Sequence, residues 1–118
     1  MPWTVLFHSA FEPEFEALPL AVQEALAATA TLLVTHGPRL GRPHADTLSG
    51  SRYANMKELR FVAQDGVWRA AFAFDPARHA VILVAADKAG IGQKRFYKAL
   101  IAKADKRFTD HVENLKES

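Results

Sequence analysis

The sequence predicts an α+β fold in which an antiparallel sheet packs against helices, with the element order β-α-α-β-β-β-α. One observation is a run of three segments rich in β-branched and aromatic residues, separated by short turn signals. Another is helical periodicity on both sides of that run. The chain has 118 residues, 49% of them hydrophobic and 24% charged. We therefore expect a single domain over residues 1–118 with its own core.

The N-terminal third is expected to form one strand and two acidic helices. Residues 3–7 are aromatic and β-branched, as in a strand. Ser9 with Glu12 is a capping-box pattern, which predicts a short helix that Pro19 ends. A second helix ends at Gly37, because glycine readily takes the left-handed cap conformation. Its apolar stripe contains Leu18, Val22, Leu26, Thr29, Leu32 and Leu33.

Residues 37–55 predict a long loop, because they are rich in glycine, proline and serine and show neither the helical nor the strand periodicity of apolar residues. The loop is also basic, with Arg39, Arg42, His44 and Arg52. A long basic loop in a small domain favours a contact surface for nucleic acid or a partner protein. A flexible connector without a role is the alternative.

Three strands are expected next, at residues 56–63, 67–74 and 80–86. Asp65-Gly66 and Asp75-Pro76 are strong turn formers, and such short links make the strands antiparallel neighbours. A final amphipathic helix follows, with lysines and arginines beside its apolar stripe. That stripe contains Phe96, Leu100, Ala104, Phe108, Val112 and Leu115.

The alternation of the middle strands predicts two arginines close together. Side chains two residues apart share a face, so Trp68 and its apolar partners place Arg69 on the opposite face. Glu58 and Arg60 point away from the apolar Leu59 in the same way. A simple hairpin register then brings Arg60 beside Arg69. Paired guanidinium groups suit a phosphodiester, whereas an ordinary ion pair with Glu58 is the alternative reading.

Composition excludes several classes of protein. The chain has no cysteine, which removes disulfides, thiolate metal sites and cysteine nucleophiles. Its five histidines show no HExxH or HxH pattern and no carboxylate at ligand spacing, so we expect no metal site. Nucleotide-cofactor motifs are missing too, and we expect no cofactor. We find no leader peptide or membrane span, and we expect a cytoplasmic protein with no membrane partner.

Charge is unevenly distributed along the chain. Residues 1–35 contain four acidic residues and no lysine or arginine. Residues 36–118 carry all 15 basic side chains and the other 9 of the 13 acidic ones. This basic excess favours a polyanionic partner, and a solvated basic surface without a partner is the alternative.

Four short motifs in their order along the chain resemble the RelE/HigB toxin superfamily, and most closely its phage-derived HigB-like branch. The motifs are Lys57-Glu58-Leu59-Arg60, Gly66-Val67-Trp68-Arg69, Ile82-Leu83-Val84-Ala85-Ala86-Asp87-Lys88, and Phe96-Tyr97 through Ala104-Asp105-Lys106-Arg107-Phe108. The resemblance covers nearly the whole chain. It implies a RelE-like fold and the toxin of a type II toxin–antitoxin system, a metal-independent endoribonuclease that cuts mRNA on the ribosome and so blocks translation.

The resemblance also implies roles for particular residues. Arg60 and Arg69 would stabilise the phosphate, Lys88 would bind or steer the backbone, and Tyr97 would stack on or orient a nucleotide. Glu58 departs from the lysine-rich pattern of the RelE strand, and it would serve as a base or hold an arginine. The expected RNA-binding residues are Arg39, Arg42, His44, Arg52, Lys57 and Lys94.

The family implies three partners: the ribosome, mRNA and a cognate antitoxin, commonly a helix-turn-helix protein of the HigA type. Two other functions are compatible with the sequence. ParE-like relatives share the fold and poison DNA gyrase by protein binding without RNase activity. A non-catalytic nucleic-acid-binding module would use the same basic face and leave RNA uncut.

Overall fold

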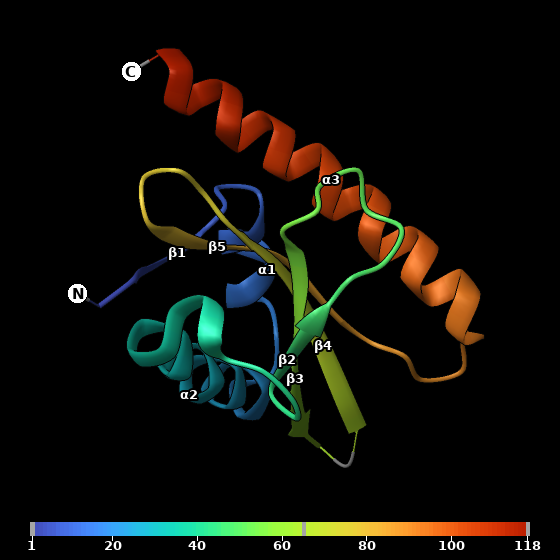
Figure 1. Ribbon diagram of the computed structural model, residues 1–118. Coiled ribbons are helices and arrows are strands. Elements are labelled where there is room, and N and C mark those ends of the chain that lie inside the picture. The colour runs from blue at the N-terminus through green and yellow to red at the C-terminus, as the bar shows by residue number, and fades with distance from the viewer. Residues whose placement is uncertain (1, 65, 118) are drawn as a thin grey trace.

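The computed structural model describes residues 2–64 and 66–117. A five-stranded sheet in the order β1-β5-β4-β3-β2 forms its centre (Figure 1). The strands are β1 Thr4–Phe7, β2 Ala45–Thr47, β3 Met56–Ala63, β4 Gly66–Phe74 and β5 His79–Asp87. The helices are α1 Phe11–Glu16, α2 Leu20–His36, the 3-10 turn η1 Gly37–Arg39 and α3 Gln93–Glu117. The predicted α+β class is confirmed.

The sheet differs from the prediction in two ways. The segment predicted as a loop contains β2, which pairs antiparallel with β3 and raises the number of strands from four to five. The sheet is also mixed, because β1 lies parallel to β5 at the edge, whereas the other pairs are antiparallel. The turn at Asp75 is confirmed, whereas Asp65 of the other predicted turn lies outside the described residues.

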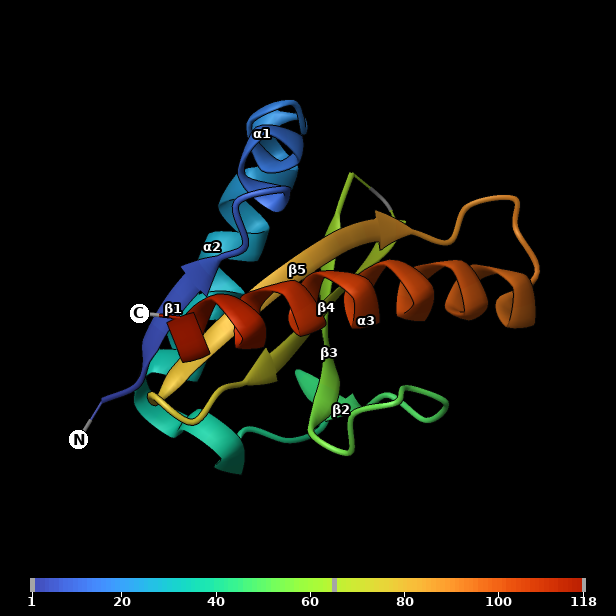
Figure 2. The same cartoon turned by 90° about the horizontal axis from the view of Figure 1, so that it is seen from above.

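Two apolar layers cover the two faces of the sheet, with α2 and α3 on opposite sides of it in Figure 1 and α3 crossing in front of the strands in Figure 2. The layer under α2 contains Leu26, Leu33 and the even-numbered apolar residues of β4, such as Phe72. The layer under α3 contains Phe96, Leu100 and Phe108. The helical stripes predicted from sequence are therefore the buried faces, and residues of the middle strands alternate between the two layers.

The predicted capping box at the start of the first helix is wrong. Helix α1 begins at Phe11, and Ser9 lies outside its N-cap position, which Ala10 occupies without a side-chain hydrogen bond. His8 fulfils the role instead: its ring Nδ1 accepts a hydrogen bond from the Ala10 N–H, and its carbonyl accepts one from the Phe11 N–H. A side chain two residues upstream thus satisfies a free donor of the first turn.

The end of α2 at Gly37 matches the prediction, but the glycine does not take the predicted left-handed cap conformation, because its ψ is −136°. Gly37 has φ +53°, a conformation that glycine tolerates best, and its N–H donates to the Leu33 carbonyl. A Cβ at Gly37 would overlap Cδ1 and Nε1 of Trp3, so the indole ring also requires glycine here. Within the described residues, no helix is both long enough and apolar enough to cross a membrane.

Candidate functional site

The pairing of β3 with β4 places the two predicted arginines side by side. Arg60 and Arg69 are direct partners in the register, and Leu59 pairs with Ala70 on the opposite face. Arg60 and Arg69 therefore lie on the face that α3 covers, beyond the apolar layer of that helix. The sequence prediction of this arginine pair is confirmed.

Glu58 lies between the two guanidinium groups. Its Oε2 is 3.3 Å from Nη2 of Arg60, and its Oε1 is 3.6 Å from Nε of Arg69. The carboxylate side chain is only 4% exposed, whereas the Arg60 side chain is 39% exposed. The alternative predicted from sequence, an ion pair with Glu58, is therefore present, and one carboxylate serves both arginines.

Tyr97 completes the cluster from the first turns of α3. Its hydroxyl donates a 2.8 Å hydrogen bond to Oε1 of Glu58. The Arg69 guanidinium carbon lies 5.7 Å from the ring centroids of both Phe96 and Tyr97, within cation–π range. A carboxylate, two guanidinium groups and a phenol from three elements thus converge on one point.

Electrostatic interactions and burial shift the pKa values of Arg60 and Tyr97. The hydrogen bond to Glu58 raises the pKa of the Arg60 guanidinium. Burial, and after it the hydrogen bond to Glu58, raises the pKa of the Tyr97 phenol. Arg60 therefore stays charged at neutral pH, and Tyr97 stays protonated as a hydrogen-bond donor.

Both arginines have a buried Nε donor that makes no hydrogen bond, although Nε of Arg69 lies 3.6 Å from the Glu58 carboxylate. Among the described residues, the buried side-chain polar atoms without a hydrogen-bond partner are Nε of Arg60 and Nε of Arg69. A buried donor without any partner, such as Nε of Arg60, costs about 1–3 kcal/mol. Stability alone does not favour this arrangement, which is typical of a site built to receive a ligand.

Two hollows adjoin the cluster. Glu58, Arg60 and Tyr97 line a hollow of about 900 Å³, together with Lys94 and Lys98 of α3. Arg69 lines a second hollow of about 500 Å³ with Lys88, which follows β5. The five expected catalytic residues are therefore near one another, with the arginine pair at the border of the two hollows.

Several of the expected RNA-binding residues also lie near the site. Lys94 lines the larger hollow. Nε of Arg42 is 3.0 Å from Oδ2 of Asp46, an oxygen that lies 3.8 Å from Arg60. The carbonyl of His44 accepts a hydrogen bond from the Arg60 N–H.

The loop that carries Arg52 is fixed to α3. Asp105 accepts hydrogen bonds from the Ser51 hydroxyl and the Arg52 N–H, and it lines the larger hollow. The Arg52 guanidinium carbon lies 5.4 Å from the Tyr53 ring centroid. The predicted loop is therefore partly ordered by contacts with the final helix.

Two expected RNA-binding residues lie elsewhere. Lys57 pairs with Phe72 and shares the face of Leu59, which is the face opposite Arg60. Arg39 is exposed in η1, directly after α2, the helix that covers this opposite face. The alternation of β3 already places Lys57 away from Glu58.

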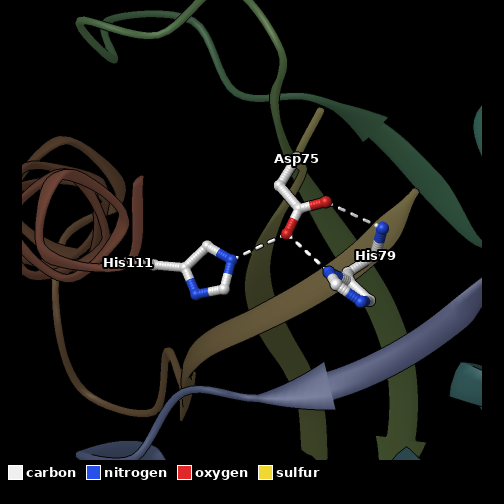
Figure 3. Close-up of side chains that lie close together, drawn as sticks. All are labelled: Asp75, His79 and His111. Carbon is white, nitrogen blue, oxygen red and sulfur yellow. Dashed lines mark hydrogen bonds and ion pairs between the residues drawn. The ribbon is translucent and has the colours of Figure 1, made fainter. Parts of the chain in front are cut away.

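A second polar cluster was missed in the sequence. Asp75, His79 and His111 each offer a ligand atom, and these atoms lie within 4.8 Å of one another (Figure 3). The expectation that no histidine has a carboxylate at ligand spacing is wrong, since Asp75 precedes His79 by four residues. Burial raises the pKa of Asp75, but hydrogen bonds from His111 and His79 outweigh it and hold the pKa below its usual value. Only the fold brings His111 to this pair.

The arrangement around Arg60 and Arg69 suits chemistry on a phosphodiester. Guanidinium groups bind phosphate oxygens and stabilise the extra charge of a pentacoordinate transition state. A phenol donor and a carboxylate beside them provide groups for orientation and proton transfer. Lysines at the rim of the hollow add attraction for a polyanion.

Comparisons with known proteins identify relatives. Residues 13–109 match the family described as "Phage derived protein Gp49-like (DUF891)". The chain is similar to two proteins of Mycobacterium tuberculosis (strain ATCC 25618 / H37Rv), named "Putative toxin HigB2" and "Putative toxin HigB3". Identity to the first is 44% over 90 residues, which cover 75% of this chain and 44% of that protein. Identity to the second is 43% over 93 residues, which cover 79% of each chain.

A solved structure has the same fold. An arginine-to-alanine double mutant of the Escherichia coli toxin RelE in the free state matches with a TM-score of 0.60 and 13% sequence identity. The match covers 87% of this chain and 97% of that one. At this identity the likeness concerns the fold, and it agrees with the predicted RelE-like architecture.

Proposed function

This chain belongs to the phage-derived Gp49-like family, within the RelE/HigB toxin superfamily, and on that basis we propose that it is the toxin of a type II toxin–antitoxin module. We propose that it blocks translation as an endoribonuclease that cuts mRNA on the ribosome. The observation that carries the proposal is the pair of Arg60 and Arg69 at the border of two hollows, each with a buried Nε that makes no hydrogen bond.

The proposed reaction uses the 2′-hydroxyl of the RNA as nucleophile. Its oxygen attacks the adjacent phosphorus, and the bond from phosphorus to the 5′-oxygen breaks. The products are a 2′,3′-cyclic phosphate and a 5′-hydroxyl end. Glu58 accepts the proton of the nucleophile, and the leaving oxygen takes a proton from solvent. Such proton transfer contributes typically about 10²–10⁴-fold to a rate.

The other groups of the site stabilise the transition state and orient the RNA in this scheme. Arg60 and Arg69 stabilise the charge of the pentacoordinate phosphate. Removal of one such donor typically lowers kcat by about 10²–10³-fold. Tyr97 orients the nucleotide through its ring and keeps Glu58 in place through its hydroxyl. Lys88 binds the RNA backbone from the second hollow. The scheme uses no metal ion at this site.

Residues at the rim are proposed to bind RNA and ribosome. Four of the expected RNA-binding residues surround the larger hollow or contact the elements that form it: Lys94, Arg42, His44 and Arg52. Their contacts with phosphates should make association steeply dependent on salt concentration. We place this activity in the cytoplasm, where mRNA is translated.

A cognate antitoxin is the proposed regulatory partner, and we propose a helix-turn-helix protein of the HigA type. A toxin that stops translation must be neutralised in the cell that encodes it. The basic site offers an antitoxin a surface for acidic side chains, and binding there would block RNA.

A reconstituted translation reaction tests the proposal. Purified protein is added to ribosomes stalled on a defined mRNA, and cuts are mapped by primer extension. We expect codon-phased cuts with wild-type protein, none on the same mRNA without ribosomes, and none with Arg69→Ala protein that retains its circular dichroism spectrum. Absence of cuts by the folded wild-type protein contradicts the proposal. Inhibition of gyrase supercoiling by the same preparation would then support the ParE-like function.

A further inference from the structure

The cluster of Asp75, His79 and His111 joins a tight turn to the last helix. Asp75 follows β4 and His79 begins β5, so the hairpin between these strands holds both residues. His111 comes from the second half of α3. Figure 3 shows both imidazole rings directed at one carboxylate oxygen.

The carboxylate is oriented by the backbone of its own turn. Oδ1 of Asp75 accepts hydrogen bonds of 2.9 Å from the Ala77 N–H and 2.8 Å from the His79 N–H. Oδ2 lies 2.7 Å from Nδ1 of His79 and 2.7 Å from Nε2 of His111. One oxygen is thus fixed by the main chain, and the other is directed at the two ring nitrogens.

We propose that Asp75, His79 and His111 bind a divalent transition metal ion such as Zn²⁺. Two imidazole nitrogens and one carboxylate oxygen are a ligand set that zinc accepts, with a fourth position left for water. The ion replaces the two ring protons that now bridge to Oδ2. The hydrogen bonds to Oδ1 then act as the outer contacts that orient a ligating carboxylate.

Metal binding requires the rings to move both relative to Asp75 and relative to each other, because the three ligand atoms now lie within 4.8 Å of one another. Ligand atoms about 2.0–2.1 Å from a tetrahedral zinc lie roughly 3.3 Å from one another. The two contacts of 2.7 Å to Oδ2 are shorter, so each ring would move away from Asp75 by about half an ångström. Both histidine side chains are partly exposed, at 26% and 16%, and have room for this shift, whereas the Asp75 side chain is fully buried.

The site would serve stability and not RNA cleavage. His111 follows Tyr97 by fourteen residues in α3, which corresponds to about 21 Å along the helix axis at 1.5 Å per residue. A bound ion therefore lies far from the arginine pair. It would fasten the turn between β4 and β5 to the C-terminal half of α3, beyond the packing of Phe108.

Metal titration of untagged, chelator-treated protein tests the site. We expect one Zn²⁺ per chain by isothermal titration calorimetry, and with Co²⁺ the intense visible absorption of a tetrahedral centre. At metal concentrations 100-fold above Kd the melting temperature should rise by roughly 10 °C. Saturable binding and the rise should disappear in His111→Gln and His79→Asn proteins.

His36→Gln is the matched control, because His36 is an exposed histidine at the end of α2. It should bind one ion as the wild type does. No saturable binding by the folded wild-type protein overturns the proposal, as does binding that persists in the His111→Gln variant. If either variant fails to fold, the Co²⁺ spectrum of the wild-type protein decides, because a weak octahedral spectrum contradicts the site. The outcome is independent of RNA cleavage, which this titration does not measure.

Discussion

Replacing Glu58 with glutamine tests whether one carboxylate holds the two arginines together. The substitution keeps size and an acceptor oxygen but removes the charge that lies between Arg60 and Arg69. The paired guanidinium groups would then face each other across neighbouring strands without a shared counter-ion. We expect both stability and RNA cleavage to fall.

The expected loss of stability follows from burial. Removing one partner of a buried ion pair costs about 3–5 kcal/mol. The Arg60 side chain is 39% exposed, so solvent screens part of its interaction, and glutamine still accepts from Tyr97. We therefore expect about 2–3 kcal/mol. For a domain of this length the melting temperature should fall by roughly 8–12 °C.

Urea unfolding followed by circular dichroism measures this loss, and a double mutant isolates its cause. Adding Arg69→Gln to Glu58→Gln removes one of the unneutralised charges, so the double mutant should be about 1 kcal/mol more stable than additive effects predict. Glu24→Gln, at an exposed position of α2, should stay within about 0.5 kcal/mol of wild type. A Glu58→Gln protein as stable as the wild type, or strictly additive effects, would refute the shared counter-ion.

Three further predictions concern the scaffold. The hydrogen bond from Arg107 lowers the pKa of Glu14. The Glu14 carboxylate therefore contributes its full stabilisation above the unfolded pKa of about 4.3, and this stabilisation is lost as pH falls through the lower folded pKa. The free energy of unfolding of Glu14→Gln protein should fall less steeply with decreasing pH over this range. Gly37→Ala should cost more than about 2 kcal/mol, because the left-handed φ and the contact with Trp3 both oppose a Cβ; a thermal melt equal to that of wild type would contradict this. Leu26→Ala, at a fully buried position, should cost about 2–5 kcal/mol in urea unfolding, and a cost below 1 kcal/mol would mean that α2 packs loosely.

The sequence predicted those features that local patterns determine. The alternation in β3 and β4 was enough to place Arg60 beside Arg69, because a two-residue period and a short turn leave one simple register. The end of α2 at Gly37 was predictable for the same kind of reason, since glycine adopts a positive φ more readily than other residues. Tyr97 was predicted as a site residue because the family resemblance implied its role.

Features that depend on tertiary contacts escaped prediction. Strand β2 has three residues, too few for a periodicity, and it exists because β3 offers it a free edge. Ser9 matched a capping box, but the fold uses His8 one residue earlier. His111 is distant in sequence from Asp75 and His79, so no spacing rule brings them together. Lys57 was predictable in principle, because its position in β3 already puts it on the face opposite Arg60.

Mapping new mRNA 5′ ends in bacteria tests the account most directly. Wild-type protein and the Arg69→Ala variant are induced without antitoxin, with translation running and with translation blocked. The account predicts codon-phased cuts from the wild-type protein that vanish when translation stops, and no cuts from the variant. Growth arrest by the wild-type protein without such cuts, or equal cutting by Arg69→Ala, would contradict a ribosome-dependent nuclease built on the arginine pair.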